Sequence, residues 1–239
     1  MTQQTMFLKN TETFAESLAR CGVKFHFAYP ITPATDVMKR MAVILPQYGG
    51  KMLQMESELA VSSALAGAAC TGMLCATSSS GPGMTLMQEA ISFMCGAELP
   101  CLMLDSMRVG PGDGDILGAQ SDYYMSTRGG GHGDYHVPVL APSDGQEIVD
   151  LVPEGIRLAY TYRTPVLFVF DGVTAQTTET AVLPEYHDYS PSRHALGSTA
   201  TPSEPRLGFN TMAFGTSTTG YPCSSTPRYV TPLAATCPA

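Results

Sequence analysis

The segment KMLQMESELAVSSALAGAAC, residues 51–70, joins a short apolar run to an alanine-rich one through a turn that carries two glutamates. Its first part, residues 51–55, predicts a strand, and its second part, residues 57–70, predicts a helix. Glu56 and Glu58 therefore lie at a strand-to-helix turn, directly before a helix too apolar to be solvated on every side. A carboxylate at that place is costly to desolvate unless it has a specific partner.

The alternation of short apolar runs with longer helical patterns continues on both sides of this segment. Further strands are predicted over residues 24–28, 73–77, 101–105, 137–140 and 165–170. Further helices are predicted over residues 11–20, 34–45, 84–95 and 144–160, with a shorter one near Gln120. Continuous apolar strands suit a parallel sheet that is covered on both faces, and the alternation implies right-handed crossovers. The predicted fold class is α/β, a doubly wound, mostly parallel sheet with helices on both faces.

The alternation stops near Tyr189, where the chain becomes dense in Ser, Thr, Pro and Gly. Such a composition buries too little apolar surface to offset the entropy lost on ordering. We therefore expect one domain over residues 1–188 and a disordered or extended tail over residues 189–239.

The composition excludes some classes of function. The 239 residues carry a formal net charge of −8, and only 14% of them are charged. This balance argues against a nucleic-acid partner, which needs a basic face. No apolar stretch is long enough to cross a bilayer, and residues 1–5 lack the basic start of a signal peptide, so we expect no membrane partner and a cytoplasmic location. The low charge predicts that partner subunits cover part of the surface.

The cysteines give no sign of a metal or disulfide site. There are seven, at positions 21, 70, 75, 95, 101, 223 and 237, and none forms a Cys-x-x-Cys pair. Their spacing does not match iron–sulfur binding patterns, so we expect any such cluster on another chain. The first five lie in apolar surroundings, where a free cysteine acts as a small hydrophobic residue.

Polar loops follow the carboxyl ends of several predicted strands, which is where open α/β sheets bind ligands. In the first loop, YPITP over residues 29–33, Thr32 is either a ligand contact or only a helix cap. The second loop, SSSGPG over residues 78–83, is either an anion or ligand site at a helix N-terminus or an ordinary tight turn.

Two later loops are also candidates. Arg108 directly follows a predicted strand and precedes a glycine-rich loop over residues 109–118. Its guanidinium can grip a carboxylate with two parallel hydrogen bonds, or can form an ordinary surface ion pair. The loop GGGHGDYH, residues 129–136, predicts close approach of another chain, with His132 near a ligand rather than in a metal site.

These motifs, taken in order over residues 8–184, resemble the α subunit of 2-oxoacid:ferredoxin oxidoreductases, in the 2-oxoglutarate and branched-chain branch. The segments that carry the resemblance are YPITP at 29–33, ESE at 56–58, TSSSGPG at 77–83, LMQEAIS at 86–92, GAELP at 96–100 and GGGHGDY at 129–135. In that family this region is the pyrimidine-binding domain of a thiamine diphosphate enzyme.

The resemblance implies roles for individual residues. Glu58, rather than its rival Glu56, matches the catalytic glutamate that contacts the aminopyrimidine ring of the cofactor. Thr32 and Arg108 match residues that hold the carboxylate of the substrate. The remaining positions with an implied role are Pro30, Ser79, Ser80 and Gly81 at the cofactor and His132 at an interface or ligand.

The resemblance also implies partners. The diphosphate, its Mg²⁺ and an iron–sulfur cluster belong to a β subunit; γ and δ subunits, ferredoxin and coenzyme A are further partners. The chain alone is expected to be inactive. It departs from the family pattern in an unusually acidic loop over residues 113–118 and in the residues beyond Tyr189, where we expect truncation or a replaced end. The alternatives are a half-chain of another thiamine diphosphate enzyme and a non-catalytic assembly subunit.

Overall fold

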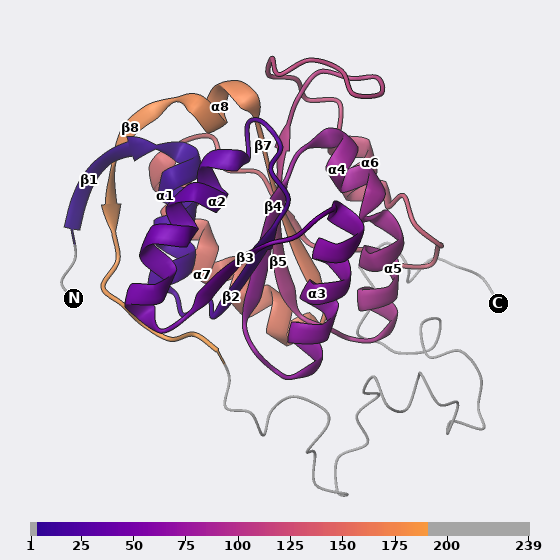
Figure 1. The fold of residues 1–239 in the computed structure, drawn as a ribbon, viewed down its shortest axis with the longest axis horizontal. Coiled ribbons are helices and arrows are strands. Elements are labelled where there is room, and N and C mark those ends of the chain that lie inside the picture. Colours follow the sequence, from indigo (N-terminus) through magenta and orange to yellow (C-terminus); the bar gives the residue numbers. More distant parts are fainter. Residues whose placement is uncertain (1–3, 191–239) are drawn as a thin grey trace, which may run out of the picture.

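A six-stranded parallel sheet forms the centre of the computed structural model, which describes residues 4–190 (Figure 1). The strand order is β3 (Lys51–Gln54), β2 (Phe25–Ala28), β4 (Cys75–Ser79), β5 (Cys101–Met107), β7 (Pro165–Asp171) and β6 (Val139–Leu140). Every neighbouring pair runs parallel. The predicted doubly wound parallel sheet is confirmed, whereas the predicted tail lies almost wholly outside the described residues.

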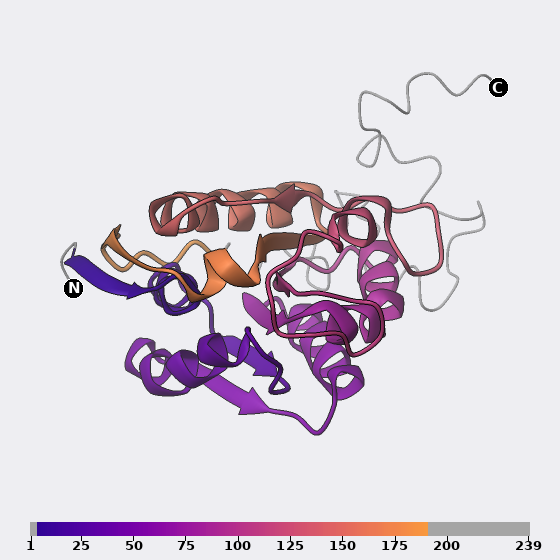
Figure 2. The same cartoon turned by 90° about the horizontal axis from the view of Figure 1, so that it is seen from above.

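Helices cover both faces of the sheet, as Figure 2 shows from above. On one face, α1 (Asn10–Arg20), α2 (Thr35–Ile44) and α7 (Gly145–Tyr162) pack around Phe14 and Phe168. On the other face, α3 (Glu58–Cys70), α4 (Gly81–Leu86) and α5 (Gln88–Gly96) pack around Leu65 and Met103. The single helix predicted over 84–95 is thus two helices that meet at Met87.

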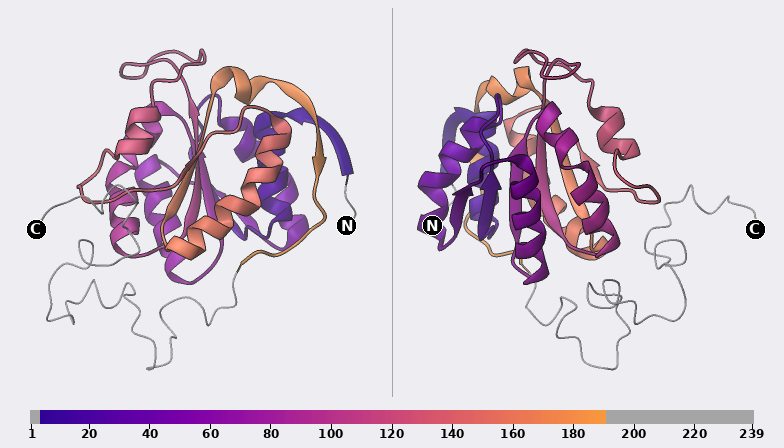
Figure 3. Two further views of the ribbon diagram at one scale, coloured as in Figure 1. Left: turned by 180° about the vertical axis from the view of Figure 1, so that it is seen from behind. Right: turned by 45° about the vertical axis from the view of Figure 1, so that its right-hand side comes forward.

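An antiparallel ribbon was not anticipated from the sequence. It pairs β1 (Gln4–Lys9) with β8 (Thr178–Leu183) and lies beside α1 (Figure 3). The ribbon contributes only a small hydrophobic cluster, in which Ala181 and Leu183 pack with Val149 of α7. The shorter elements are η1 (Leu45–Tyr48), α6 (Tyr123–Arg128) and α8 (Gly172–Gln176).

The described cysteines behave as small hydrophobic residues, as predicted. Cys21, Cys75, Cys95 and Cys101 are buried, and Cys70 is half-buried. Burial raises the pKa of the thiols of Cys21 and Cys95 to about 12, so both stay protonated at neutral pH. The prediction for Cys223 and Cys237 falls outside the described residues.

The chain reverses its direction across the sheet between β2 and β4. It leaves β2 through α2 to reach β3 on one side, and it returns through α3 to β4 on the other side of β2. The loop after β2 leads to α2 on one face and the loop after β4 leads to α4 on the other, so these loops separate at the carboxyl ends of β2 and β4. Such a point is where open α/β sheets form ligand crevices.

Candidate active site

An open cavity of about 550 Å³ lies at the carboxyl ends of the central strands. The loop of residues 109–118, seen at the top of Figure 1, forms part of its wall. The lining residues come from four segments: Tyr29, Pro30, Ile31 and Thr32 after β2; Glu58 at the start of α3; Pro82, Gly83 and Leu86 of α4; and Arg108, Asp113, Gly114, Asp115 and Ile116 after β5. The fold therefore brings Pro30, Thr32, Glu58 and Arg108 together.

Glu58 is the first residue of α3 and lies at the wall of this cavity. Ser57 caps the helix, because its Oγ accepts a hydrogen bond from the backbone N–H of Ala60 at 3.3 Å. Glu58 is only 7% exposed, whereas Glu56 is exposed and does not line the cavity. The position of the helix start therefore distinguishes Glu58, which faces the cavity, from Glu56, which does not, whereas residue spacing alone did not separate the two.

Gly83 makes room for the Glu58 carboxylate. A Cβ atom on Gly83 would lie 2.6 Å from Oε1 and 3.1 Å from Cγ of Glu58, and it would clash with Oγ of Ser79. Each of these contacts is closer than ordinary van der Waals contact. Only glycine is therefore compatible with the observed positions of Glu58 and Ser79.

The loop of residues 78–83 uses most of its backbone donors within the chain. The N–H of Gly81 donates to Oδ1 of Asp105 at 3.1 Å, and that of Gly83 donates to the carbonyl of Ser80 at 2.8 Å. The hydroxyls of Ser79 and Ser80 are buried and have no hydrogen-bond partner among the described residues. Neither serine nor Gly81 lines the cavity.

Asp105, near the end of β5, is a buried acid that the sequence reasoning missed. Burial first, and then the carboxylate of Asp122, hold the pKa of Asp105 well above its usual value, although the N–H of Gly81 lowers it. Its Oδ2 atom has no partner among the described residues. Asp105 therefore supports the turn before α4 by accepting a hydrogen bond from the backbone N–H of Gly81. The sequence did offer a signal for this buried acid, because Asp105 directly follows the apolar run CLML at residues 101–104.

Arg108 connects the loop after β2 to the loop after β5. Its Nη1 donates to the carbonyl of Thr32 at 2.9 Å, and its Nη2 donates to the carbonyl of Asp113 at 2.8 Å and to Oδ1 of Asp113 at 2.9 Å. The Arg108 side chain is 8% exposed, whereas that of Asp113 is 99% exposed. The guanidinium thus lies at the cavity and already holds one carboxylate. That geometry suits both the carboxylate-binding and the loop-bracing interpretations.

Thr32 is not a helix cap. The helix α2 begins at Thr35 with Ala34 as its N-terminal flanking residue, and no side chain caps it. Thr32 is exposed at the cavity, and its carbonyl accepts from Arg108. The cap interpretation is therefore wrong, and the hydroxyl is free to meet a ligand.

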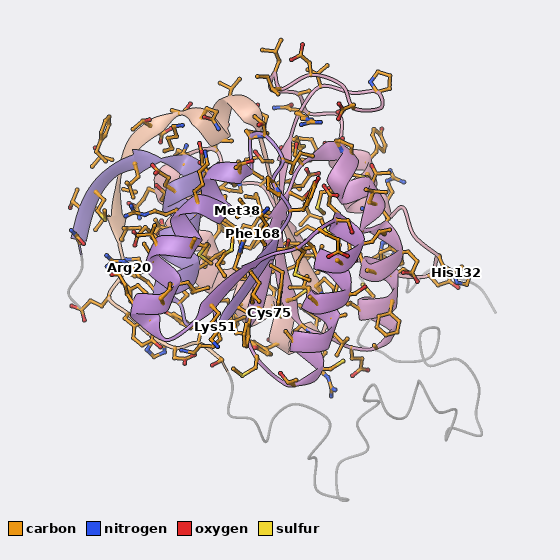
Figure 4. The ribbon with its side chains drawn as sticks, viewed as in Figure 1. Arg20, Met38, Lys51, Cys75, His132 and Phe168 are labelled. Atoms are coloured by element: carbon orange, nitrogen blue, oxygen red, sulfur yellow. The ribbon has the colours of Figure 1, made fainter. Side chains whose placement is uncertain are left out.

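His132 lies away from the cavity. Figure 4 shows it at the outer edge of the molecule, on the loop beyond α5. Its carbonyl accepts from Oγ of Ser92 at 2.5 Å, and the N–H of Gly130 donates to Oε1 of Gln88, so the loop packs on α5. His132 is exposed and does not line the cavity, which leaves an interface as its remaining predicted role. Within residues 4–190 there is no group of three His, Cys, Asp or Glu residues that could hold a metal ion.

A carboxylate at the switch point of a doubly wound sheet, with glycine making room beside it, is compatible with a domain that binds one part of a cofactor. The family model for the thiamine diphosphate-binding region of pyruvate flavodoxin/ferredoxin oxidoreductases matches residues 16–232. The chain belongs to this family.

Similar proteins support the assignment. The chain is 43% identical over 181 residues to the ketoisovalerate oxidoreductase subunit VorB of Methanothermobacter thermautotrophicus, covering 76% of this chain and 51% of that protein. It is 38% identical over 177 residues to the 2-oxoglutarate synthase subunit KorA of Methanocaldococcus jannaschii, covering 74% and 48%. The chain spans about half the length of these curated relatives.

A solved structure has the same fold. It is 2-oxoglutarate:ferredoxin oxidoreductase from Magnetococcus marinus, with 2-oxoglutarate, coenzyme A and succinyl-CoA bound. The match has a TM-score of 0.75 and 32% identity, and it covers 84% of this chain and 38% of that one. Among the described residues, no helix combines the length and apolar character that crossing a membrane requires.

Proposed function

We propose that this chain is the pyrimidine-binding part of the α subunit of a 2-oxoacid:ferredoxin oxidoreductase. The complex would convert a 2-oxoacid to an acyl-CoA by oxidative decarboxylation and pass electrons to ferredoxin. The observation that carries this proposal is Glu58, a carboxylate at a cavity wall with Gly83 directly beside it. Relatives named as ketoisovalerate and 2-oxoglutarate enzymes support the choice of reaction.

The residues present fit the pyrimidine half of thiamine diphosphate. Oε1 of Glu58 lies beside the space that a side chain at position 83 would fill. Glu58 would hold or share a proton at a ring nitrogen of the aminopyrimidine, and Pro30 would shape the adjacent wall. Ser79, Ser80 and Gly81 would act from the turn between β4 and α4, outside the cavity lining. When bound, the cofactor supplies the nucleophilic carbon and the electron sink that decarboxylation needs.

Arg108 and Thr32 would hold the carboxylate of the 2-oxoacid. The guanidinium is nine-tenths buried and lies at the cavity, so its attraction for an anion is screened less than at an open surface. The Thr32 hydroxyl lies on the same rim and would orient the bound acid. The carboxylate of Asp113, which now pairs with Arg108, would have to share or yield that position.

A partner chain would complete the site. In α3, Glu58 is the single charged residue, although Leu59 is 57% exposed and Ser63 and Gly67 are exposed as well. Phe93 of α5, a helix in contact with α3, is 45% exposed. A helix that is apolar on all sides is normally buried, so this surface suits a β subunit carrying the diphosphate, Mg²⁺ and iron–sulfur sites. Further γ and δ subunits would belong to the same cytoplasmic complex.

The test is Glu58→Gln in the complex formed with the partner chains. We expect turnover to fall by ~10²–10⁴-fold, as is typical when a general acid–base group is lost. Hydrogen–deuterium exchange at the reactive thiazolium carbon measures the affected step directly, and ferredoxin reduction measures turnover. Glu56→Gln is the matched control, because Glu56 is exposed and lies outside the cavity. Unchanged exchange in Glu58→Gln would contradict the assignment, and no oxidation of any 2-oxoacid by the wild-type complex would contradict the proposed reaction.

A further inference from the structure

The cavity wall is unusually acidic for a site that would bind an anion. Its described lining includes one cationic side chain, Arg108, and three carboxylates, those of Glu58, Asp113 and Asp115. Asp113 pairs with Arg108, so the positive charge is already compensated in part. No lysine or second arginine lies among the described residues of the wall.

Asp115, like Glu58, is a carboxylate of this wall without an ion pair among the described residues. Its Oδ1 atom accepts a hydrogen bond at 2.6 Å from the backbone N–H of Ile116, the next residue. No ion pair to Asp115 is found within residues 4–190. The backbone holds Asp115 at the wall as well, because its N–H donates to the carbonyl of Val109 at 2.9 Å.

Apolar side chains lie on the same wall. Ile116 is 60% exposed and Leu86 is 50% exposed, and both line the cavity together with Ile31. Ile116 directly follows Asp115, so one loop presents an aliphatic group and a negative charge together. An aliphatic ligand would cover these side chains, whereas a second anionic group would meet Asp115.

We propose that Asp115 and Ile116 determine substrate specificity by favouring 2-oxoacids with an uncharged aliphatic side chain over those with a second carboxylate. The inference rests on the proposed function. The carboxylate next to the ketone takes up the one cation of this wall, so a second carboxylate has no partner here and is repelled by Asp115. An aliphatic side chain instead displaces water from Ile116 and Leu86.

The test compares two substrates in the complex with its partner chains. The ratio of kcat/KM for 2-oxoisovalerate to that for 2-oxoglutarate is measured for the wild type, Asp115→Asn and Asp115→Lys. We expect the wild type to prefer 2-oxoisovalerate. Removing the repelling charge in Asp115→Asn should raise kcat/KM for 2-oxoglutarate roughly three- to tenfold, and Asp115→Lys should raise it further. Values for 2-oxoisovalerate should change less than those for 2-oxoglutarate, so the ratio should fall in Asp115→Asn.

A matched control and a second measurement separate the causes. Asp134→Asn removes an exposed carboxylate from the loop packed on α5, away from the cavity, and should leave the ratio unchanged. Calorimetry with 2-hydroxyisovalerate and 2-hydroxyglutarate, which lack the reactive ketone, should show the same shift in binding preference without turnover.

The outcomes distinguish this inference from the proposed function. A wild-type preference for 2-oxoglutarate, or Asp115 variants that shift the ratio no more than Asp134→Asn does, overturns the inference while the proposed function stands. A complex that oxidises neither 2-oxoacid with ferredoxin overturns the proposed function and this inference with it.

Discussion

Gly83→Ala should disable the proposed catalytic carboxylate without changing any polar group. The new Cβ atom would lie 2.6 Å from Oε1 of Glu58, whereas ordinary contact begins at 3.4 Å. Glu58 must therefore retreat by about 0.8 Å or change its rotamer, because interiors are too densely packed to absorb the overlap elsewhere. Ser79 blocks a compensating movement of α4, since its Oγ would clash with the same Cβ atom.

The expected size of the effect follows from this displacement. Misplacing a catalytic group by 1 Å costs on the order of 10²-fold in rate, so turnover should fall roughly 10- to 100-fold. Overpacking destabilises a core by ~1–3 kcal/mol, and replacing a helical glycine by alanine returns ~0.5–1 kcal/mol. The free energy of unfolding should therefore fall by about 0–2.5 kcal/mol, a loss small enough for the variant to fold.

Two measurements test this prediction. Thermal or denaturant unfolding of the chain gives the change in stability, and exchange at the thiazolium carbon in the complex gives the change in activation. The control for stability is Gly67→Ala in α3, where an added Cβ meets no atom within 4 Å. It should stabilise the isolated chain by ~0.5–1 kcal/mol. If Gly83→Ala keeps full turnover, the carboxylate is not confined by Gly83 and the reasoning fails.

Three further predictions follow from the described contacts. Arg108→Met should raise KM for the 2-oxoacid about ten- to a hundredfold. Asp113→Ala should lower KM, because the Asp113 carboxylate competes with that of the substrate for Arg108. A lower melting temperature with unaltered KM in Arg108→Met would instead support the loop-bracing interpretation. The isolated chain should bind thiamine diphosphate weakly, which tight Mg²⁺-dependent binding in calorimetry would contradict. Burial lowers the pKa of His26 to about 3. As the pH falls below ~6.5, only the unfolded state takes up a proton on this imidazole. The free energy of unfolding should therefore fall by up to ~1.4 kcal/mol per pH unit until about pH 3. This contribution to the pH dependence should be lost in His26→Leu.

The order of the secondary structure followed from local patterns. Apolar runs such as CLML at 101–104 have no face left for water, and they became strands buried on both sides in the sheet. The boundaries were less predictable where the apolar pattern continues across a break. Leu86 and Met87 are both apolar, so nothing in the pattern marked Met87 as the break between α4 and α5.

The β1–β8 ribbon was missed for a different reason. Its pairing joins Gln4 to Leu183 across almost the whole described chain. The strands alternate only weakly between apolar and polar residues, because one face of the ribbon is exposed and little of the other is buried. Pairing between segments so far apart leaves almost no local signal in either one.

The sequence pattern placed the candidate site at the carboxyl ends of the strands, because parallel strands joined by crossovers bring those ends to one edge of the sheet. Thr32, Glu58 and Arg108 meet there for that reason. The family resemblance favoured Glu58 over Glu56, and the tertiary structure shows that Glu58 lines the cavity. Only the tertiary structure decided which carboxylate pairs with Arg108 and that His132 lies elsewhere. These points depend on the exact start of α3, the path of the loop of residues 109–118 and the packing of another loop on α5. A side chain's direction and its partners from distant segments are set by packing between elements, which residue spacing along the chain does not encode.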